Sequence, residues 1–198
     1  ELTLDTNTAH RNLKLSNTNR KVTCVKEEQP YPDHPERFES YPQLLCRDGV
    51  TGRCYWEVER KGGVVIAVSY RGISRRRGGS GDCMFGWNDK SWSLSCSDGG
   101  YSVSHNNIET AIPSSVSNRV AVYVDWPAGS LSFYTVSSDS LIHIYTFNTT
   151  FAQPLYPGFG LRFGLRCWLR FGSRSEGSSV SLCPVEDREY PPVTESDS

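Results

Sequence analysis

Hydrophobic and polar residues alternate along short segments of the chain, and clusters of Gly, Asn, Asp, Ser and Pro separate these segments. Alternation with a period of two is typical of β-strands, because successive side chains point to opposite faces of a sheet. The pattern predicts an all-β fold, with a short helical turn near the N-terminus as its only helix. The predicted strands are residues 54–59, 64–70, 92–95, 119–126, 130–136, 141–147 and 179–183.

The segment 119–126 shows this alternation clearly, with valines at 120, 122 and 124 on one face and Ala121, Tyr123 and Asp125 on the other. The turn Pro127-Ala128-Gly129 follows it. Pro fixes φ and Gly adopts a conformation barred to other residues, so we predict a β-hairpin here. Many short strands without covering helices favour two antiparallel sheets packed face to face.

Length, composition and charge limit the number of domains and the classes of partner that this chain can bind. A chain of 198 residues is long enough for one buried core, and 12% of its residues are aromatic, which suits sheet packing. The formal net charge of -1 provides no broad field for nucleic acid or an anionic membrane. The longest apolar run, 64–68, is far shorter than the roughly 18–20 residues that span a bilayer. Because the chain begins at Glu1 and has Met84 as its one methionine, we expect it to be part of a longer protein.

Seven cysteines lie scattered at positions 24, 46, 54, 83, 96, 167 and 183, without a C-x-x-C pair or a Cys/His cluster. This pattern predicts no metal site and favours reduced thiols in the cytoplasm over a disulfide framework. The sequon that begins at Asn148 matters only in a secreted chain.

The four histidines, at 10, 34, 105 and 143, are dispersed, and no Ser or Cys lies in a nucleophile motif such as G-x-S-x-G. We therefore expect that this chain is not an enzyme and needs no cofactor. An active site assembled from scattered residues is the alternative, and it would require measurable turnover by the isolated domain.

Three ordered motifs and a closing strand resemble one known family. Residues 4–10 read LDTNTAH, similar to the LDPNTAH opening of the PRY part, and residues 52–59 read GRCYWEVE, similar to the G-R-x-Y-W-E-V-E of the SPRY part. Residues 124–134, VDWPAGSLSFY, resemble the LDYEAGTLSFY signature, and 177–183 resemble the closing strand. The departures are Thr6 for Pro, and Trp126-Pro127 for Tyr-Glu. The chain is identified as a member of the PRY-SPRY (B30.2) family in its fish type.

This resemblance implies a bent antiparallel β-sandwich, a concanavalin-like jelly roll with a short N-terminal helical PRY segment. The expected domain covers residues 1–185, with PRY at about 1–50 and SPRY at about 51–185. The acidic, Ser-containing tail 186–198 is expected to be disordered.

The resemblance also implies a non-catalytic module that recognises a target protein through variable loops at one end of the sandwich. Such domains occur in tripartite-motif ubiquitin ligases, NLR-type immune receptors and stonefish-type toxins. We expect a cytoplasmic recognition domain of an innate-immune or ubiquitin-ligase parent, whose RING chemistry lies elsewhere. The alternative is the C-terminal domain of a secreted pore-forming toxin. We expect a protein partner and no nucleic acid or membrane.

The resemblance implies that loops 31–38, 70–82, 97–107 and 152–159 line the binding face. The loop 70–82 contains four arginines but lacks the Gly-Lys-Ser/Thr ending of a phosphate-binding loop. It is either a solvated connection or a contact for an acidic partner through Arg75, Arg76 and Arg77. The candidate partner-binding residues are Tyr31, Arg37, Phe38, Arg75, Arg76, Arg77, Trp87, Asp98, Tyr101, His105, Trp126, Tyr156 and Phe159.

Residues 161–172, LRFGLRCWLRFG, repeat a Leu-Arg block three times. The resemblance implies an insertion at 160–176, between the last two elements of the family pattern. From Phe159 to Gly172 apolar residues occupy odd positions, which favours an extended strand or β-hairpin. A helix would place Gly164 in its interior and stack three arginines, at a cost of about 1 kcal/mol for the glycine. A membrane contact, and a mis-spliced or recently duplicated segment, are the alternatives.

Overall fold

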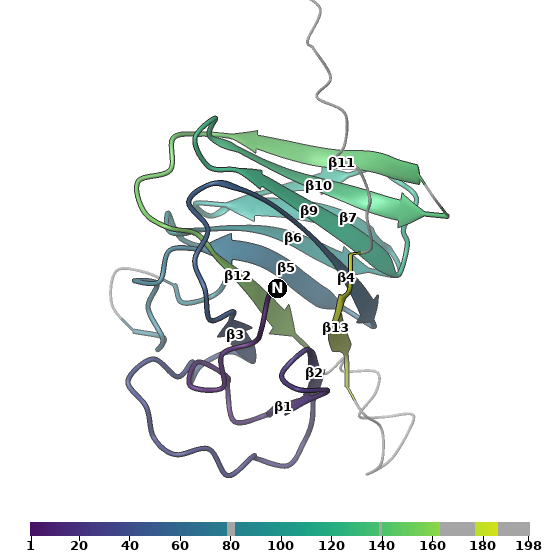
Figure 1. Ribbon diagram of the computed structural model, residues 1–198. Helices are drawn as coiled ribbons and strands as arrows, with labels where there is room; N and C mark the ends of the chain where they lie inside the picture. Colours follow the sequence, from purple (N-terminus) through teal and green to yellow (C-terminus); the bar gives the residue numbers. More distant parts are fainter. Residues whose placement is uncertain (79–81, 139, 163–176, 186–198) are drawn as a thin grey trace, which may run out of the picture.

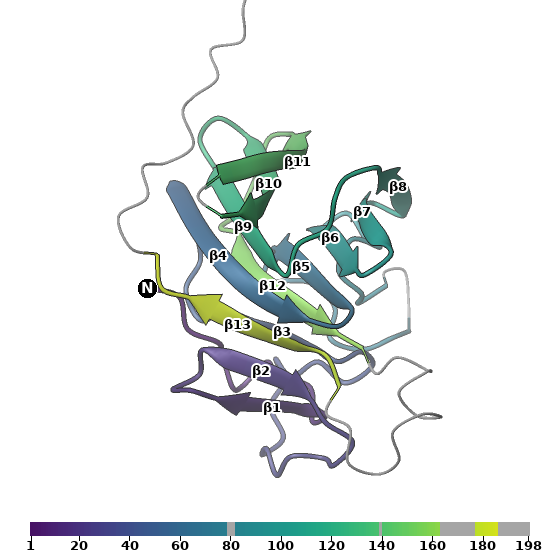
Figure 2. The same ribbon diagram turned by 90° about the vertical axis from the view of Figure 1, so that its right-hand side faces the viewer.

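Two antiparallel sheets form the domain, as a computed structural model shows for residues 1–78, 82–138, 140–162 and 177–185 (Figures 1 and 2). The seven-stranded sheet has the order β1-β2-β13-β4-β9-β10-β11, and the six-stranded sheet has the order β3-β12-β5-β6-β7-β8. No helix occurs in these residues, and thus none that could cross a membrane.

The first sheet contains β1 (Leu13–Ser16), β2 (Lys21–Cys24), β13 (Ser179–Cys183), β4 (Arg53–Lys61), β9 (Arg119–Asp125), β10 (Ser130–Ser137) and β11 (Ser140–Asn148). The second contains β3 (Gln43–Leu45), β12 (Tyr156–Leu161), β5 (Val64–Ser69), β6 (Ser91–Ser97), β7 (Gly100–His105) and β8 (Ile108–Ile112). The all-β sandwich is confirmed, and all seven predicted strands are present within one or two residues at each end.

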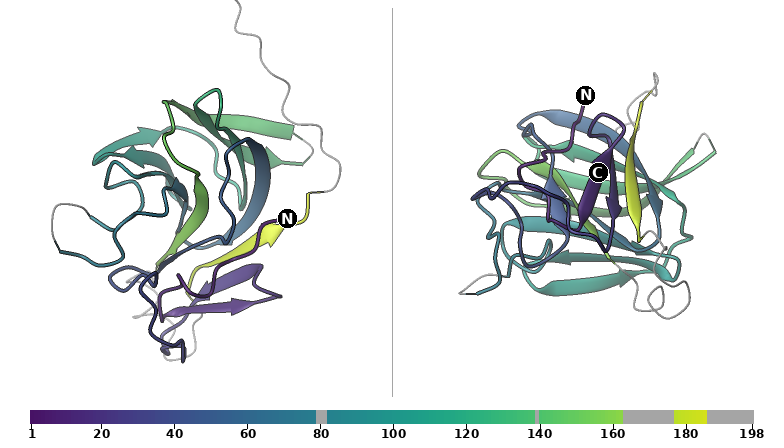
Figure 3. Two further views of the ribbon diagram at one scale, coloured as in Figure 1. Left: turned by 60° about the vertical axis from the view of Figure 1, so that its left-hand side comes forward. Right: turned by 90° about the horizontal axis from the view of Figure 1, so that it is seen from below.

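The predicted helical turn near the N-terminus is wrong. The segment instead forms β1 and β2, joined by a turn in which Asn17, Thr18 and Asn19 have φ of 52°, 54° and 58°. Asn tolerates this left-handed region better than most residues, so the chain reverses instead of continuing as a helix. These N-terminal strands, purple in Figure 3, extend the sheet beyond the yellow strand β13, with which β2 pairs.

The core lies between the two sheets. Val120, Val122 and Val124 of β9 are fully buried there, as the alternation predicted, and Ala121 on the opposite face is also buried. Trp56 of β4 pairs with Val122 and joins the same core. The inner face of β9 is therefore buried, and its opposite face is partly covered.

The predicted hairpin after β9 is also present. Ser130 pairs with Asp125, and the Gly129 N–H donates to the carbonyl of Trp126 at 3.2 Å. Gly129 has φ of +72°, and a Cβ there would lie 1.9 Å from the carbonyl oxygen of Thr149. Only glycine satisfies both the turn and this close approach.

Part of the expected insertion belongs to the sandwich. Gly160 and Leu161 lie in β12, where they pair with Val65 and Val64, and Leu161 is buried. The rest of the repeat, 163–176, lies outside the described residues, as does the tail 186–198. The described residues on either side of 163–176 lie close together, because the Arg162 N–H donates to Ser178 Oγ at 3.0 Å.

Candidate functional site

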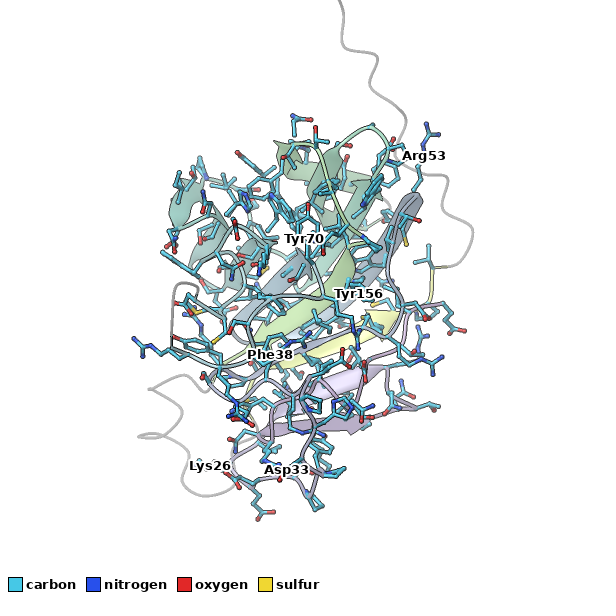
Figure 4. The ribbon with its side chains drawn as sticks, turned by 90° about the vertical axis from the view of Figure 1, so that its left-hand side faces the viewer. Lys26, Asp33, Phe38, Arg53, Tyr70 and Tyr156 are labelled. Carbon is cyan, nitrogen blue, oxygen red and sulfur yellow. The ribbon has the colours of Figure 1, made fainter. Side chains whose placement is uncertain are left out.

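Three loops and the N-terminal turn come together where the PRY and SPRY parts meet. We call this the junction site: Asp5 with loops 31–40, 70–77 and 152–156. The Glu39 N–H donates to the carbonyl of Arg75 at 3.0 Å, and the Ala152 N–H donates to the Tyr70 hydroxyl at 2.9 Å. Figure 4 shows Phe38, Tyr70 and Tyr156 on this one side of the molecule. Loops far apart in sequence thus form one surface.

Arg71 holds these pieces together. Its guanidinium donates to both carboxylate oxygens of Glu36, at 2.7 and 2.8 Å, and to Asp5 at 3.1 Å. The same group lies 5.1 Å from the ring centre of Tyr156. Hydrogen bonding to Arg71 lowers the pKa of Glu36, so this carboxylate remains charged at neutral pH. A bidentate pair of this kind fixes geometry as well as charge.

The three consecutive arginines of loop 70–77 have different roles. Arg75 donates to the carbonyls of Glu36 and Arg71, at 2.8 and 2.6 Å, and its guanidinium lies over the Phe38 ring. Burial lowers the pKa of Arg75. The hypothesis that Arg75 contacts a partner therefore needs correction, because its donors already serve the fold.

Arg76 and Arg77 project into solvent. The Arg76 side chain is 75% exposed and pairs with Glu39 at 2.9 Å. Arg77 is exposed too, while its backbone N–H donates to Ser40 Oγ at 2.6 Å. Two guanidinium groups are thus presented by a backbone that the neighbouring loop holds in place.

Four other candidates are buried and cannot reach a partner in this conformation. Phe38 packs edge-on against Phe85 at 5.6 Å, Phe159 lies in the central core, and the Tyr101 hydroxyl accepts from the Ser117 N–H at 3.0 Å. Their relative exposures are 1%, 0% and 3%. They support the loops and sheets from inside.

Arg37 is the fourth, with 2% exposure. It donates to the carbonyls of Thr6, Ala9 and Pro32 at 2.7–2.9 Å. A charged side chain survives burial only when its donors are satisfied in this way. Arg37 therefore fastens the opening turn to loop 31–40.

Tyr31, Tyr156 and Trp126 are half-buried at the junction site or beside it. The Tyr31 hydroxyl donates to the Leu13 carbonyl at 2.6 Å, and Trp126 Nε1 donates to the Gln153 carbonyl at 2.8 Å. Part of each ring remains accessible to a partner.

The remaining candidates lie elsewhere or at the margin. Asp98 sits in the β6–β7 turn, where it pairs with Arg60 at 3.5 Å. This turn is at the other end of β6 from Tyr70, about 20 Å away. Trp87 borders a hollow of about 480 Å³ on the outer face of the second sheet. His105 stacks on Trp92 at 4.5 Å, and Trp92 contacts Tyr70, so His105 adjoins the junction site through one ring.

The thiols and the possible metal-binding groups of the domain were the other candidates for chemical activity. The six described cysteines are free, and burial raises the pKa of Cys24 and Cys96 to about 12. Within the described ranges, no group of three or more His, Cys, Asp or Glu is placed to hold a metal ion.

Sequence reasoning missed Asp5, Glu36 and Arg71 as a set. Arg71 lies 35 positions from Glu36 and 66 positions from Asp5 in the chain, too far apart for any local pattern to link them. Arg71 was visible only as one of four arginines in its loop. Only the folded structure brings these three residues together.

Comparison with known proteins agrees with the motifs. The family profile of PRY, the SPRY-associated domain, matches residues 2–50, and that of the SPRY domain matches residues 53–174. Neoverrucotoxin subunit beta of Synanceia verrucosa is 42% identical over 162 residues, which are 80% of this chain and 23% of the toxin subunit. Tripartite motif-containing protein 16 of Mus musculus is 37% identical over 164 residues, 81% of this chain and 29% of that protein.

Two solved structures share the fold. A stonustoxin structure superposes with a TM-score of 0.78 at 37% identity, covering 92% of this chain and 27% of the toxin chain. The TRIM65 PSpry domain superposes with a TM-score of 0.77 at 28% identity, covering 93% of this chain and 90% of that one. This chain spans about a quarter of the length of the toxin subunits that it matches. The chain belongs to the PRY-SPRY family, whose domains are generally non-catalytic protein-interaction modules.

Proposed function

We propose that this domain captures a partner protein at the junction site and that the partner presents acidic side chains to Arg76 and Arg77. The observation that carries the proposal is the contrast within one loop. Arg71 and Arg75 are fixed by hydrogen bonds to Asp5, Glu36 and backbone carbonyls, whereas Arg76 and Arg77 are exposed. A preformed loop loses little conformational freedom on binding, so it can hold a partner with few contacts.

Two half-buried aromatic rings of the junction site support the same surface. Tyr31 is held by a hydrogen bond and Tyr156 by Arg71, yet each ring is partly accessible. Aromatic residues and arginine are the types enriched among the residues that dominate binding energy. We infer a partner surface with carboxylates that face Arg76 and Arg77 and apolar groups that face the rings.

The parent that we propose is a cytoplasmic protein of innate immunity or ubiquitination, in which this domain selects the target. Its likeness to tripartite motif-containing protein 16 supports this parent, and so do the four buried thiols at positions 24, 46, 83 and 96. Any catalytic step would belong to another domain of that parent.

The test is a pull-down with three immobilised domains: wild type, Arg76→Ala/Arg77→Ala, and Arg53→Ala. Arg53 is a matched control, because its side chain is 72% exposed and makes one ion pair, with Asp125, at 3.2 Å. Figure 4 shows it far from Phe38 on the viewed face. We expect proteins bound by wild type and by Arg53→Ala to be lost from the double variant. Equal capture by all three would reject the role of the two arginines.

A second candidate is the C-terminal domain of a secreted toxin, and the 42% identity with neoverrucotoxin subunit beta favours it. Under this proposal Asn148, which is exposed at the end of β11, would carry a glycan in the native protein. Mass spectrometry of the native protein distinguishes the two. A glycan at Asn148 supports the secreted toxin, and unmodified Asn148 with free thiols supports the cytoplasmic module.

A further inference from the structure

Among the described residues, the two sheets end in four strands, β1, β11, β3 and β8, each of which pairs with another strand on one side only. Such edges pair readily with other chains unless they are very short, bulged, or carry Pro or charged residues, especially Lys. Three of the four edges have such protection: β3 has three residues, β1 carries Lys14 among its four, and β11 has a register shift opposite Phe133 and Tyr134.

The fourth edge, β8, has one charged residue, Glu109, and none of the other features. It runs Ile-Glu-Thr-Ala-Ile from Ile108 to Ile112, contains no Lys or Pro, and pairs with β7 without a shift. All its residues except Ile112 are exposed, and Ile108 is 69% exposed. Figure 2 shows β8 at the outer end of its sheet. Among the described strands, it is the edge most open to pairing.

The turn before β8 determines which of its backbone groups point outward. Asn106 and Asn107 have φ of 51° and 65°, which fits a two-residue type I′ turn between His105 and Ile108. Such a turn closes with a hydrogen bond from the Ile108 N–H to the His105 carbonyl. Because antiparallel pairs alternate, residues 108, 110 and 112 bond to β7. The N–H and C=O groups of Glu109 and Ala111 therefore point away from the sheet.

We propose that β8 pairs with β8 of a second copy of this chain, antiparallel, about a two-fold axis at Thr110. In this register Glu109 lies opposite Ala111 of the other copy, and these are the residues whose backbone groups point outward. Each such pair exchanges two hydrogen bonds, so the two symmetric pairs form four. Ile108 lies opposite Ile112 of the other copy, and the two Thr110 residues meet at the axis, both favourable cross-strand pairs.

The two neighbouring registers of the β8–β8 pair are less stable than the one with its axis at Thr110. An axis at Glu109 places two glutamates directly opposite each other, which is destabilising. An axis at Ala111 places Glu109 opposite Pro113, which has no N–H to donate. Among the registers that its outward hydrogen-bonding groups allow, the sequence of β8 is thus self-complementary in the one with its axis at Thr110.

The dimer would be weak, because five residues from each copy bury less area than the roughly 1,600 Å² of a standard interface. Its consequence is bivalency, since one particle would carry two junction sites. Two weak binding events on one multivalent target then reinforce each other. The inference stands on β8 alone and does not depend on what the junction site binds.

Disulfide trapping tests the register. In the proposed dimer the Cα atoms of the two Thr110 residues are about 4.5 Å apart, within disulfide range. Those of the two Glu109 residues are about 8 Å apart, beyond it. We expect Thr110→Cys, oxidised with copper phenanthroline in air, to form a covalent dimer, and Glu109→Cys and wild type to form none above the background of the native cysteines. Equal cross-linking of the two variants would overturn the register.

Sedimentation velocity tests the association itself. We expect the mean mass of wild type to rise from 22.2 kDa towards twice that value as the concentration approaches about 1 mM. Thr110→Lys, which places two like charges at the axis, should remain a monomer with an unchanged melting temperature. His143→Lys, a control on the exposed β11 edge, should behave as wild type. A wild type that stays monomeric, or a Thr110→Lys variant that still dimerises, would overturn the proposal.

Discussion

Arg71→Ala should lower the free energy of unfolding by about 2–3 kcal/mol. The side chain makes three hydrogen bonds to carboxylates, at 2.7, 2.8 and 3.1 Å. Hydrogen bonds to charged groups contribute about 1.5–3 kcal/mol each when buried, but these are not additive and the Arg71 side chain is 30% exposed. The loss also leaves Asp5, with 9% of its side chain exposed, without this cation.

Urea unfolding followed by tryptophan fluorescence measures this loss, with an unchanged slope against urea as the sign of a two-state comparison. For a domain of this size, 2–3 kcal/mol corresponds to a fall in melting temperature of about 4–12 °C. Arg76→Ala is the matched control, because it removes a single ion pair from a side chain that is 75% exposed. We expect that control to change stability by less than about 0.5 kcal/mol. An Arg71→Ala variant as stable as the control would refute the view that Arg71 fastens the junction site.

The same interaction predicts a pH dependence. Arg71 lowers the pKa of Glu36 in the folded domain, so the pair stabilises the fold fully above the unfolded carboxyl pKa of about 4.3. The contribution is lost as the pH falls through the lower, folded pKa. The stability difference between wild type and Arg71→Ala should therefore stay level from pH 7 to 5 and shrink below about pH 4. A difference that persists undiminished to pH 3 would contradict this assignment.

Three further predictions concern the scaffold. Gly129→Ala should lower the free energy of unfolding by more than about 1 kcal/mol, as measured by thermal unfolding. The added Cβ would collide with the Thr149 carbonyl oxygen, and the φ of +72° disfavours alanine. Phe159→Ala should cost about 3–5 kcal/mol in urea unfolding, because its ring is fully buried. Replacing 163–176 by a short Gly-Ser linker after Arg162 should preserve cooperative unfolding, since the flanking residues Arg162 and Ser178 are in contact; a non-cooperative transition would show that the segment belongs to the core.

Strands with strong alternation could be predicted from the sequence, whereas strands built from turn-forming residues could not. In β9 the valines face the core at every second position. By contrast β12 contains Pro157, Gly158 and Gly160, which are typical of a loop, yet it lies between β3 and β5. A Cβ on Gly158 would come within 2.8 Å of the Phe85 ring, so the packing requires glycine where the local pattern predicts a turn.

For the candidate site, the loops could be predicted in outline but the roles of single residues could not. The family pattern indicated four loops, of which 31–38, 70–82 and 152–159 contribute residues to the junction site. The fourth, 97–107, is instead strand β7 with the turns on either side of it. The sequence does not distinguish Arg75, whose guanidinium bonds to backbone carbonyls, from Arg76, which faces solvent. That difference arises from contacts with Glu36 and Glu39, which only the folded chain brings near.

Amide hydrogen exchange of the domain with and without a captured partner tests the central claim most directly. Our account predicts that bound partner slows exchange in loops 31–40, 70–77 and 152–156 and leaves the β6–β7 turn and the Arg53 end of β4 unchanged. The same experiment on Arg76→Ala/Arg77→Ala should show no slowing at the concentration that saturates wild type. Slowed exchange confined to the β6–β7 turn, or to the outer face around Trp87, would contradict the account.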